Sequence, residues 1–184
     1  VLGQLEITGY SDYLHPYDET HVLGIGKETV GAEEGNFAWY QGVKISLFDV
    51  SDVEKPREIA KYEIGDRGTD SPILSDHRAF LFDKSRSLLV IPVTVAEIDP
   101  SKYPGEIPPY AYGDFVWDGA YVFHISLENG LVLQGRITHF DNDAGLMKSG
   151  YYFQSQYSVK RSLYIGNVLY TVSDSKIKMN SLLD

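Results

Sequence analysis

The sequence has no cysteine in its 184 residues. This absence excludes disulfide bonds, thiolate nucleophiles and zinc–thiolate sites within the chain. No hydrophobic run approaches the ~20 residues that a transmembrane helix needs, so we expect no membrane insertion. Residues 1–9 do not have the pattern of a signal peptide. The sequence begins with Val1 instead of Met, within a run of residues typical of a strand. We therefore interpret it as a fragment of a longer protein.

Basic residues are also scarce, with 16 Lys and Arg against 26 Asp and Glu and a net charge of −10. A surface of this sign repels phosphate backbones, and we therefore expect no nucleic-acid partner. An acidic surface suits solubility and cations, calcium among them.

What the sequence does contain is many short β-branched or aromatic runs, each ending in turn residues. Strand propensity and turn punctuation together predict an all-β protein. The runs are His21–Gly26, Val43–Val50, Ala79–Phe82, Leu88–Val95, Ala120–Ile125, Leu131–Ile137, Ser162–Ile165 and Val168–Val172.

An internal repeat organises these runs. Residues 1–7, 58–64 and 131–137 each form a run that ends in Ile, and residues 43–51 and 119–126 precede the second and third of these runs. The matched pairs in the two preceding runs are Phe48 with Phe123, Asp49 with His124, and Ser51 with Ser126; Lys176–Asn180 is a weaker third copy. A two-strand hairpin comes before each of these copies, and the last hairpin turns through Gly166 and Asn167.

The repeating unit is therefore four antiparallel strands, which is typical of the blades of a β-propeller. We predict about three blades as a fragment of a larger propeller. The predicted divisions are strand D of a preceding blade over 1–9, a blade over 10–65, a blade over 75–139 and a partial last blade over 158–184. A β-sandwich with chance internal similarity is the alternative.

Blade geometry places the long connections on one face. With the four strands of each blade lettered A to D in chain order, these are the connections from strand B to strand C and from strand D to strand A of the next blade. The A–B and C–D turns are short. Long loops on one side of a rigid scaffold favour binding there. The four long segments are Lys27–Gly42, Gly65–Asp76, Ala96–Asp118 and Thr138–Lys160.

Four strings in order along the chain resemble a known family. They are Tyr10–Asp18, Val43–Asp52, Asp76–Asp83 and Arg161–Asp174. The chain is similar over its whole length to the secreted β-propeller domain family that is distantly related to WD repeats, and corresponds to its C-terminal portion. The resemblance implies an exported protein, of archaeal type, with no catalytic residues to carry over.

Aromatic side chains beside carboxylates mark the long segments, and such rings can stack on sugars or anchor a peptide. We expect Trp39, Tyr112 and Trp117 to converge as ligand-binding residues. The alternative is that these rings pack the connections onto the blades.

Two acidic residues, Asp141 and Asp143, begin a stretch that resembles the start of a calcium loop. Later ligands of that pattern are missing, which favours a solvated turn. We therefore expect no cofactor, with calcium as the one candidate. His15, His77 and His139 lie near blade entrances but lack a metal-ligand spacing.

These patterns together predict a non-enzymatic extracellular or cell-surface binding or scaffold module of a larger propeller protein. The expected partners are a protein or carbohydrate ligand, and either the remaining blades of the parent or a second copy at the open edges. The alternative is an exported hydrolase or metal-dependent enzyme with its site near the propeller axis.

Overall fold

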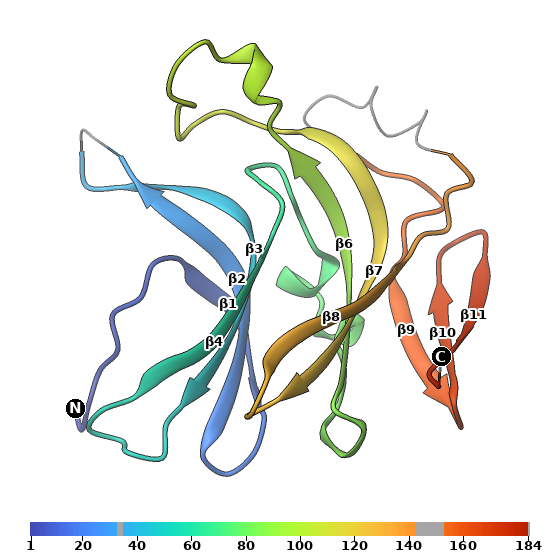
Figure 1. Ribbon diagram of the computed structural model, residues 1–184, viewed down its shortest axis with the longest axis horizontal. Coiled ribbons are helices and arrows are strands. Elements are labelled where there is room, and N and C mark those ends of the chain that lie inside the picture. The colour runs from blue at the N-terminus through green and yellow to red at the C-terminus, as the bar shows by residue number, and fades with distance from the viewer. Residues whose placement is uncertain (33–34, 143–152, 184) are drawn as a thin grey trace.

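A computed structural model describes residues 1–32, 35–142 and 153–183. The strands form three antiparallel sheets that lie side by side in Figure 1. The first sheet contains β1 (Tyr10–Pro16), β2 (His21–Gly31), β3 (Ala38–Asp49) and β4 (Arg57–Ile64). The second contains β5 (Leu81–Asp83), β6 (Leu88–Glu97), β7 (Asp114–Ser126) and β8 (Gly130–Ile137). The third contains β9 (Arg161–Ile165), β10 (Val168–Val172) and β11 (Ile177–Ser181).

Helical structure in the described residues is limited to four short 3-10 turns, η1 (Pro72–Leu74), η2 (His77–Ala79), η3 (Lys84–Arg86) and η4 (Pro100–Lys102). In each four-stranded sheet the strands follow one another in chain order. The prediction of four-stranded antiparallel blades is confirmed. No helix of the described residues is long and apolar enough to cross a membrane.

The internal repeat extends to irregularities of pairing. The register of β3 against β4 shifts between Leu47 and Phe48, and that of β7 against β8 shifts between Val122 and Phe123. These are equivalent positions, because Phe48 and Phe123 are the matched residues of the repeat. Each shift leaves one extra residue on the outer strand, which bends that strand in the same way in both sheets.

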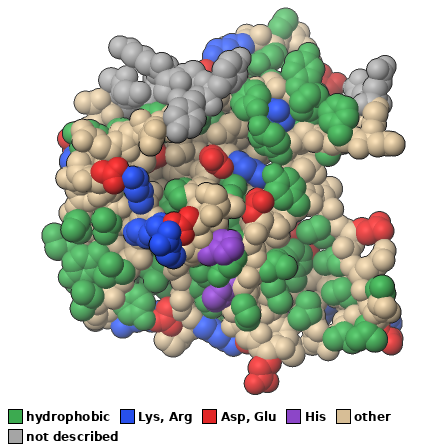
Figure 2. Space-filling view, turned by 180° about the vertical axis from the view of Figure 1, so that it is seen from behind, with side chains coloured by type: hydrophobic (Ala, Val, Ile, Leu, Met, Phe, Trp, Pro, Cys, Tyr) green, Lys and Arg blue, Asp and Glu red, His purple; other side chains and the backbone are tan. Residues whose placement is uncertain are grey.

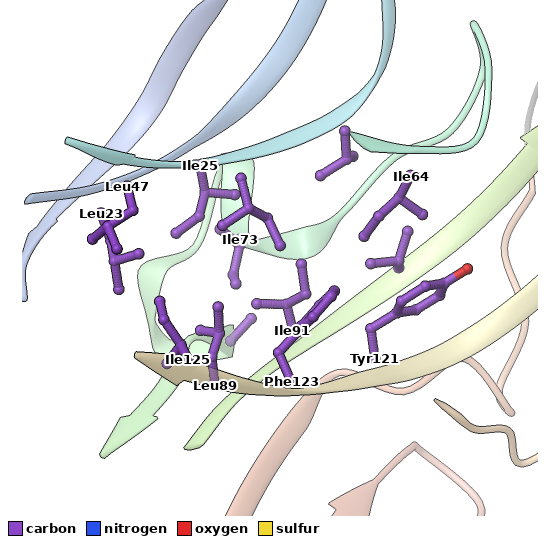
Figure 3. Close-up of a cluster of buried hydrophobic side chains, with 14 of the residues drawn as sticks. Leu23, Ile25, Leu47, Ile64, Ile73, Leu89, Ile91, Tyr121, Phe123 and Ile125 are labelled. Carbon is purple, nitrogen blue, oxygen red and sulfur yellow. The ribbon is translucent and has the colours of Figure 1, made fainter. Parts of the chain in front are cut away.

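The sheets stack through hydrophobic side chains that alternate along β6. Leu89, Ile91 and Val93 pack toward the first sheet, whereas Leu88 and Val90 pack toward the third. Figure 3 shows residues of β2 and β3 pointing toward residues of β6 and β7, with Ile73 of η1 between them. A strand that is apolar on both faces must be covered on both sides, so β6 requires a neighbouring sheet on each.

Pro92 lies within β6, where a central strand ordinarily excludes proline. The short strand β5 pairs only with residues 88–90, so no strand on that side needs an amide hydrogen from Pro92. Beside Pro92, the connection between β4 and β5 lies where a neighbouring strand would otherwise be. Its Ser71 hydroxyl donates to the carbonyl of Pro92 at 2.6 Å. This connection therefore lies close against the second sheet.

Two sequence-based boundaries differ from the structure. Residues 27–42 and 96–118 were expected to be long connections, but β2, β3, β6 and β7 extend into them and leave only 32–37 and 98–113 between strands. The β-branched and aromatic residues there continue the ladders instead of ending them. Residues 1–9 were expected as strand D of a preceding blade. The structure places them in no strand, and β1–β4 form the first sheet without them.

Candidate functional site

The connections between β2 and β3 and between β6 and β7 lie at the top of Figure 1. Residues 65–70, which follow β4, link the first and second sheets at this end of the molecule. Gly65 has a φ of +60°, and a Cβ there would meet the Thr69 hydroxyl at 2.2 Å. That hydroxyl donates to the carbonyl of Ala96 at 3.0 Å and accepts from its amide at 2.9 Å. The amide of Gly113 donates to the carbonyl of Arg67 at 2.8 Å. A segment that leaves the first sheet is thus fixed to the second.

Arg67 extends from this segment into a ring of aromatic side chains. Its guanidinium carbon lies 4.9 Å from the centroid of Trp39, 4.2 Å from that of Tyr40 and 4.4 Å from that of Tyr112. Nη1 donates to the carbonyl of Tyr40 at 3.1 Å and Nη2 to the hydroxyl of Tyr112 at 3.2 Å. Arg67 is only 6% exposed, so cation–π contacts and hydrogen bonds to a desolvated cation hold the three rings together.

The two tyrosine hydroxyls of this cluster hydrogen-bond to each other. This bond raises the pKa of Tyr40 and lowers that of Tyr112, whose hydroxyl oxygen also accepts from Arg67. The shared hydrogen bond fixes the relative orientation of rings that come from two different sheets.

Around the buried arginine, aromatic side chains reach solvent. The exposed rings are Tyr10, Phe37, Tyr40, Tyr110 and Tyr112. We call these five rings and the half-buried Trp39 the aromatic surface. It borders a pocket of about 520 Å³ lined by Tyr10, Lys27, Tyr40, Gly68, Thr69, Asp70 and Tyr112. The structure thus brings the predicted residues Trp39 and Tyr112 to one place.

Trp117 does not join them in contact with Arg67. It lies on β7 instead of in a connection, half-buried, with its ring edge-on to Tyr121 at 5.2 Å and under the guanidinium of Arg136 at 5.2 Å. It packs against the core between the first and second sheets. The structure therefore gives Trp117 a packing role.

The predicted calcium ligands lie apart from this surface. Asp143 falls outside the described residues. Asp141 is exposed, and its carboxylate accepts from Nζ of Lys176 at 2.9 Å. The same ion pair lowers the pKa of Asp141. In the part of the chain that the structure describes, no three His, Asp or Glu side chains are placed to bind a metal ion.

The three histidines near the blade entrances separate into two environments. His77 stacks on Tyr13 at 4.1 Å, and the Tyr13 hydroxyl lies 2.8 Å from Nδ1 of His15. His139 is fully buried elsewhere, between the hydroxyls of Thr171 and Ser173 at 2.9 and 2.8 Å. Histidine side chains lie on the face seen in Figure 2 among hydrophobic neighbours. The three do not form one catalytic or metal-binding group.

Sequence analysis missed a buried carboxylate. Asp118 of β7 is 2% exposed, and its Oδ2 accepts from the Thr94 hydroxyl at 2.6 Å. Loss of solvent raises its pKa from 3.8 to about 6. The hydroxyls of Thr94 and Ser158 and the amide of Val159 offset this rise only in part. The pattern of β7 contained the signal, because Asp118 shares a strand face with the buried residue Ala120.

Because the Trp117 side chain packs against the core, its truncation should destabilise the fold. Trp117→Ala should lower the free energy of unfolding by about 2–3 kcal/mol, somewhat less than the cost for a fully buried ring. The exposed Phe37 is the control, since Phe37→Ala should change stability by at most about 0.5 kcal/mol. Urea unfolding of both variants measures this, and equal stability would contradict the packing role.

The raised pKa of Asp118 should make the free energy of unfolding depend on pH. Its folded pKa lies above the unfolded value, so the folded chain binds the proton more tightly. The resulting stabilisation is complete below about pH 4 and is lost as pH rises through about 6. Asp118→Asn should therefore gain stability relative to the original chain between pH 4 and 7.5, by about 3 kcal/mol. Thermal and urea unfolding across this range should show no such trend for Asp52→Asn, an exposed control.

Comparison with known proteins places this arrangement in a family. The chain is 30% identical over 177 residues to an uncharacterised protein of Methanocaldococcus jannaschii, a match that covers 96% of the chain and 20% of that protein. It is 40% identical over 92 residues to an uncharacterised protein of Archaeoglobus fulgidus, covering 50% of the chain and 13% of that protein. The chain thus spans a fifth or less of these relatives. No solved structure matches it.

A comparison with family models gives a result that agrees with the repeated four-stranded sheets. The model of the Beta propeller domain matches residues 1–184. The chain belongs to the Beta propeller domain family.

Proposed function

We propose that this chain is a non-enzymatic binding or scaffold module of a larger propeller protein, located outside the cell or on its surface. The observation that carries the proposal is the aromatic surface, whose rings are exposed yet fixed around a buried arginine. Rings that are ordered before binding lose little conformational entropy when a ligand covers them.

The arrangement of the site supports binding over catalysis. The two Nη groups of Arg67 donate to Tyr40 and Tyr112, and the hydroxyls of these tyrosines hydrogen-bond to each other, so these polar groups hold the rings in place. Lys27, at the pocket wall, is engaged with the carbonyl of Thr69 and lies 3.3 Å from the carboxylate of Asp70. The expected ligand is a protein or carbohydrate that presents apolar or ring-shaped surface to the tyrosines. The proposed function requires no cofactor.

The extracellular location rests on the resemblance of the four strings to an exported family. The scaffold role rests on the open edge of the third sheet. β11 is its edge strand, with Ile177 60% and Met179 64% exposed. Unpaired strand edges with apolar side chains favour pairing with another strand. We propose that the remaining blades of the parent protein, or a second copy, join there.

The binding proposal is tested with a glycan array and a random-peptide phage library as probes. Tyr110→Ala and Phe37→Ala each remove an exposed ring of the aromatic surface and should weaken any selected binder by about tenfold or more, with little change in thermal stability. Leu127→Ala, which truncates an exposed apolar residue at the opposite end, is the matched control.

Binders that lose affinity in both ring variants and keep it in Leu127→Ala support the proposal. An array and library that yield no binder, or binders unaffected by the ring variants, would overturn the assignment of this surface.

A further inference from the structure

A second pocket, of about 310 Å³, lies between the second sheet and the segment that leads into the third. Its volume is within the range of small-ligand sites. Gly68 and Asp70 line both this pocket and the one beside the aromatic surface, so the two adjoin across residues 68–70. Residues that line it and enter the argument are Thr94, Phe115, Asp118, Phe153, Ser158 and Lys160.

Asp118 forms the polar part of this pocket's wall. Thr94 and Asp118 are partners in the β6–β7 ladder, so both side chains lie on the strand face directed at the third sheet. Oδ2 of Asp118 accepts the Thr94 hydroxyl. The Ser158 hydroxyl and the Val159 amide also lie close enough to the carboxyl group to lower its pKa, but Oδ1 of Asp118 has no well-aligned hydrogen-bond donor among the described residues. A buried carboxyl oxygen that lacks a well-aligned donor is costly unless a ligand supplies one.

The basic and acidic side chains around the pocket do not neutralise Asp118. Lys160 also lines the pocket, but its Nζ donates to the carboxylate of Asp174 at 2.6 Å. The other acidic lining residue, Asp70, lies 3.3 Å from Nζ of Lys27. Neither of these charged lining residues is therefore paired with Asp118.

We infer that this pocket binds an alkylammonium group, of the kind carried by a lysine side chain or a free primary amine. An ammonium has three donors, and Oδ1 of Asp118 offers a charged acceptor for one of them. Phe115 and Phe153, whose ring centroids lie 5.7 Å apart, supply aromatic surface for the cation and its alkyl stem. A divalent metal would need more oxygen ligands of negative charge than the described lining supplies.

The inference concerns a different pocket from the aromatic surface and does not depend on the proposed function. It is tested with n-butylammonium chloride as the probe, titrated into the chain while the side-chain carboxyl carbons are followed by NMR. The Asp118 resonance should shift with saturation, and the apparent pKa of Asp118 should fall on binding, because the cation favours the carboxylate. Binding should weaken between pH 7.5 and pH 5 as Asp118 becomes protonated.

Substitution separates the site from general ion association. Asp118→Asn should weaken butylammonium binding by about tenfold or more, because it removes a charge-assisted hydrogen bond. Asp52→Asn, an exposed carboxyl in the turn between β3 and β4, should bind as the original chain does. An unchanged pKa of Asp118, or equal affinity in Asp118→Asn, would overturn the inference, as would a response to CaCl₂ and none to butylammonium.

The two sources of the ammonium group are distinguished by a second comparison. A short peptide with a single lysine and the same peptide with norleucine in its place are titrated beside butylammonium. Tighter binding of the lysine peptide than of butylammonium identifies a protein side chain as the ligand. Tighter binding of butylammonium identifies a free amine. Binding of the norleucine peptide at the same affinity would contradict recognition of the ammonium group.

Discussion

The structure depends on the burial of β6 on both of its faces. Along this strand, alternate side chains enter two separate hydrophobic clusters, one shared with the first sheet and one with the third. Leu89 and Ile91 on one side and Val90 on the other are fully buried. Burying a side chain of this size contributes about 1.5–3 kcal/mol. Three sheets therefore stack face to face, with β6 in the central sheet.

Two buried charged side chains, Arg67 and Asp118, lie where neighbouring sheets meet. There Arg67 holds rings from the first and second sheets, and Asp118 lies between the second sheet and the segment leading to the third. Arg67 has its partners in two sheets, whereas the Thr94 hydroxyl that donates to Asp118 comes from the same sheet as Asp118. Such junctions are a consequence of repeating the blade, because each repeat creates a new boundary at which connections from neighbouring sheets meet.

The sequence predicted the sheets well and the site only in part. Matched residues such as Phe48 and Phe123 fixed the repeat, because strand pairing is largely local in a four-stranded blade. The ends of β2 and β3 were misplaced, since Gly31 and Gly42 punctuate the pattern as a loop would while the ladder continues around them. Trp39 and Tyr112 were selected by residue type, but Arg67, the cation that orders them, lies in another connection. Such a long-range convergence follows from how the sheets stack, which no local pattern contains.

Native-state amide hydrogen exchange measures whether burial on both faces of β6 holds the three sheets together. The amides of Leu89 and Ile91 should exchange only through global unfolding of the chain, with opening free energies equal to the free energy of unfolding. Amides of the edge strand β11 should exchange through smaller openings. Exchange of the β6 amides as fast as those of β11 would contradict the account, because β6 would then not be the strand on which the three sheets depend.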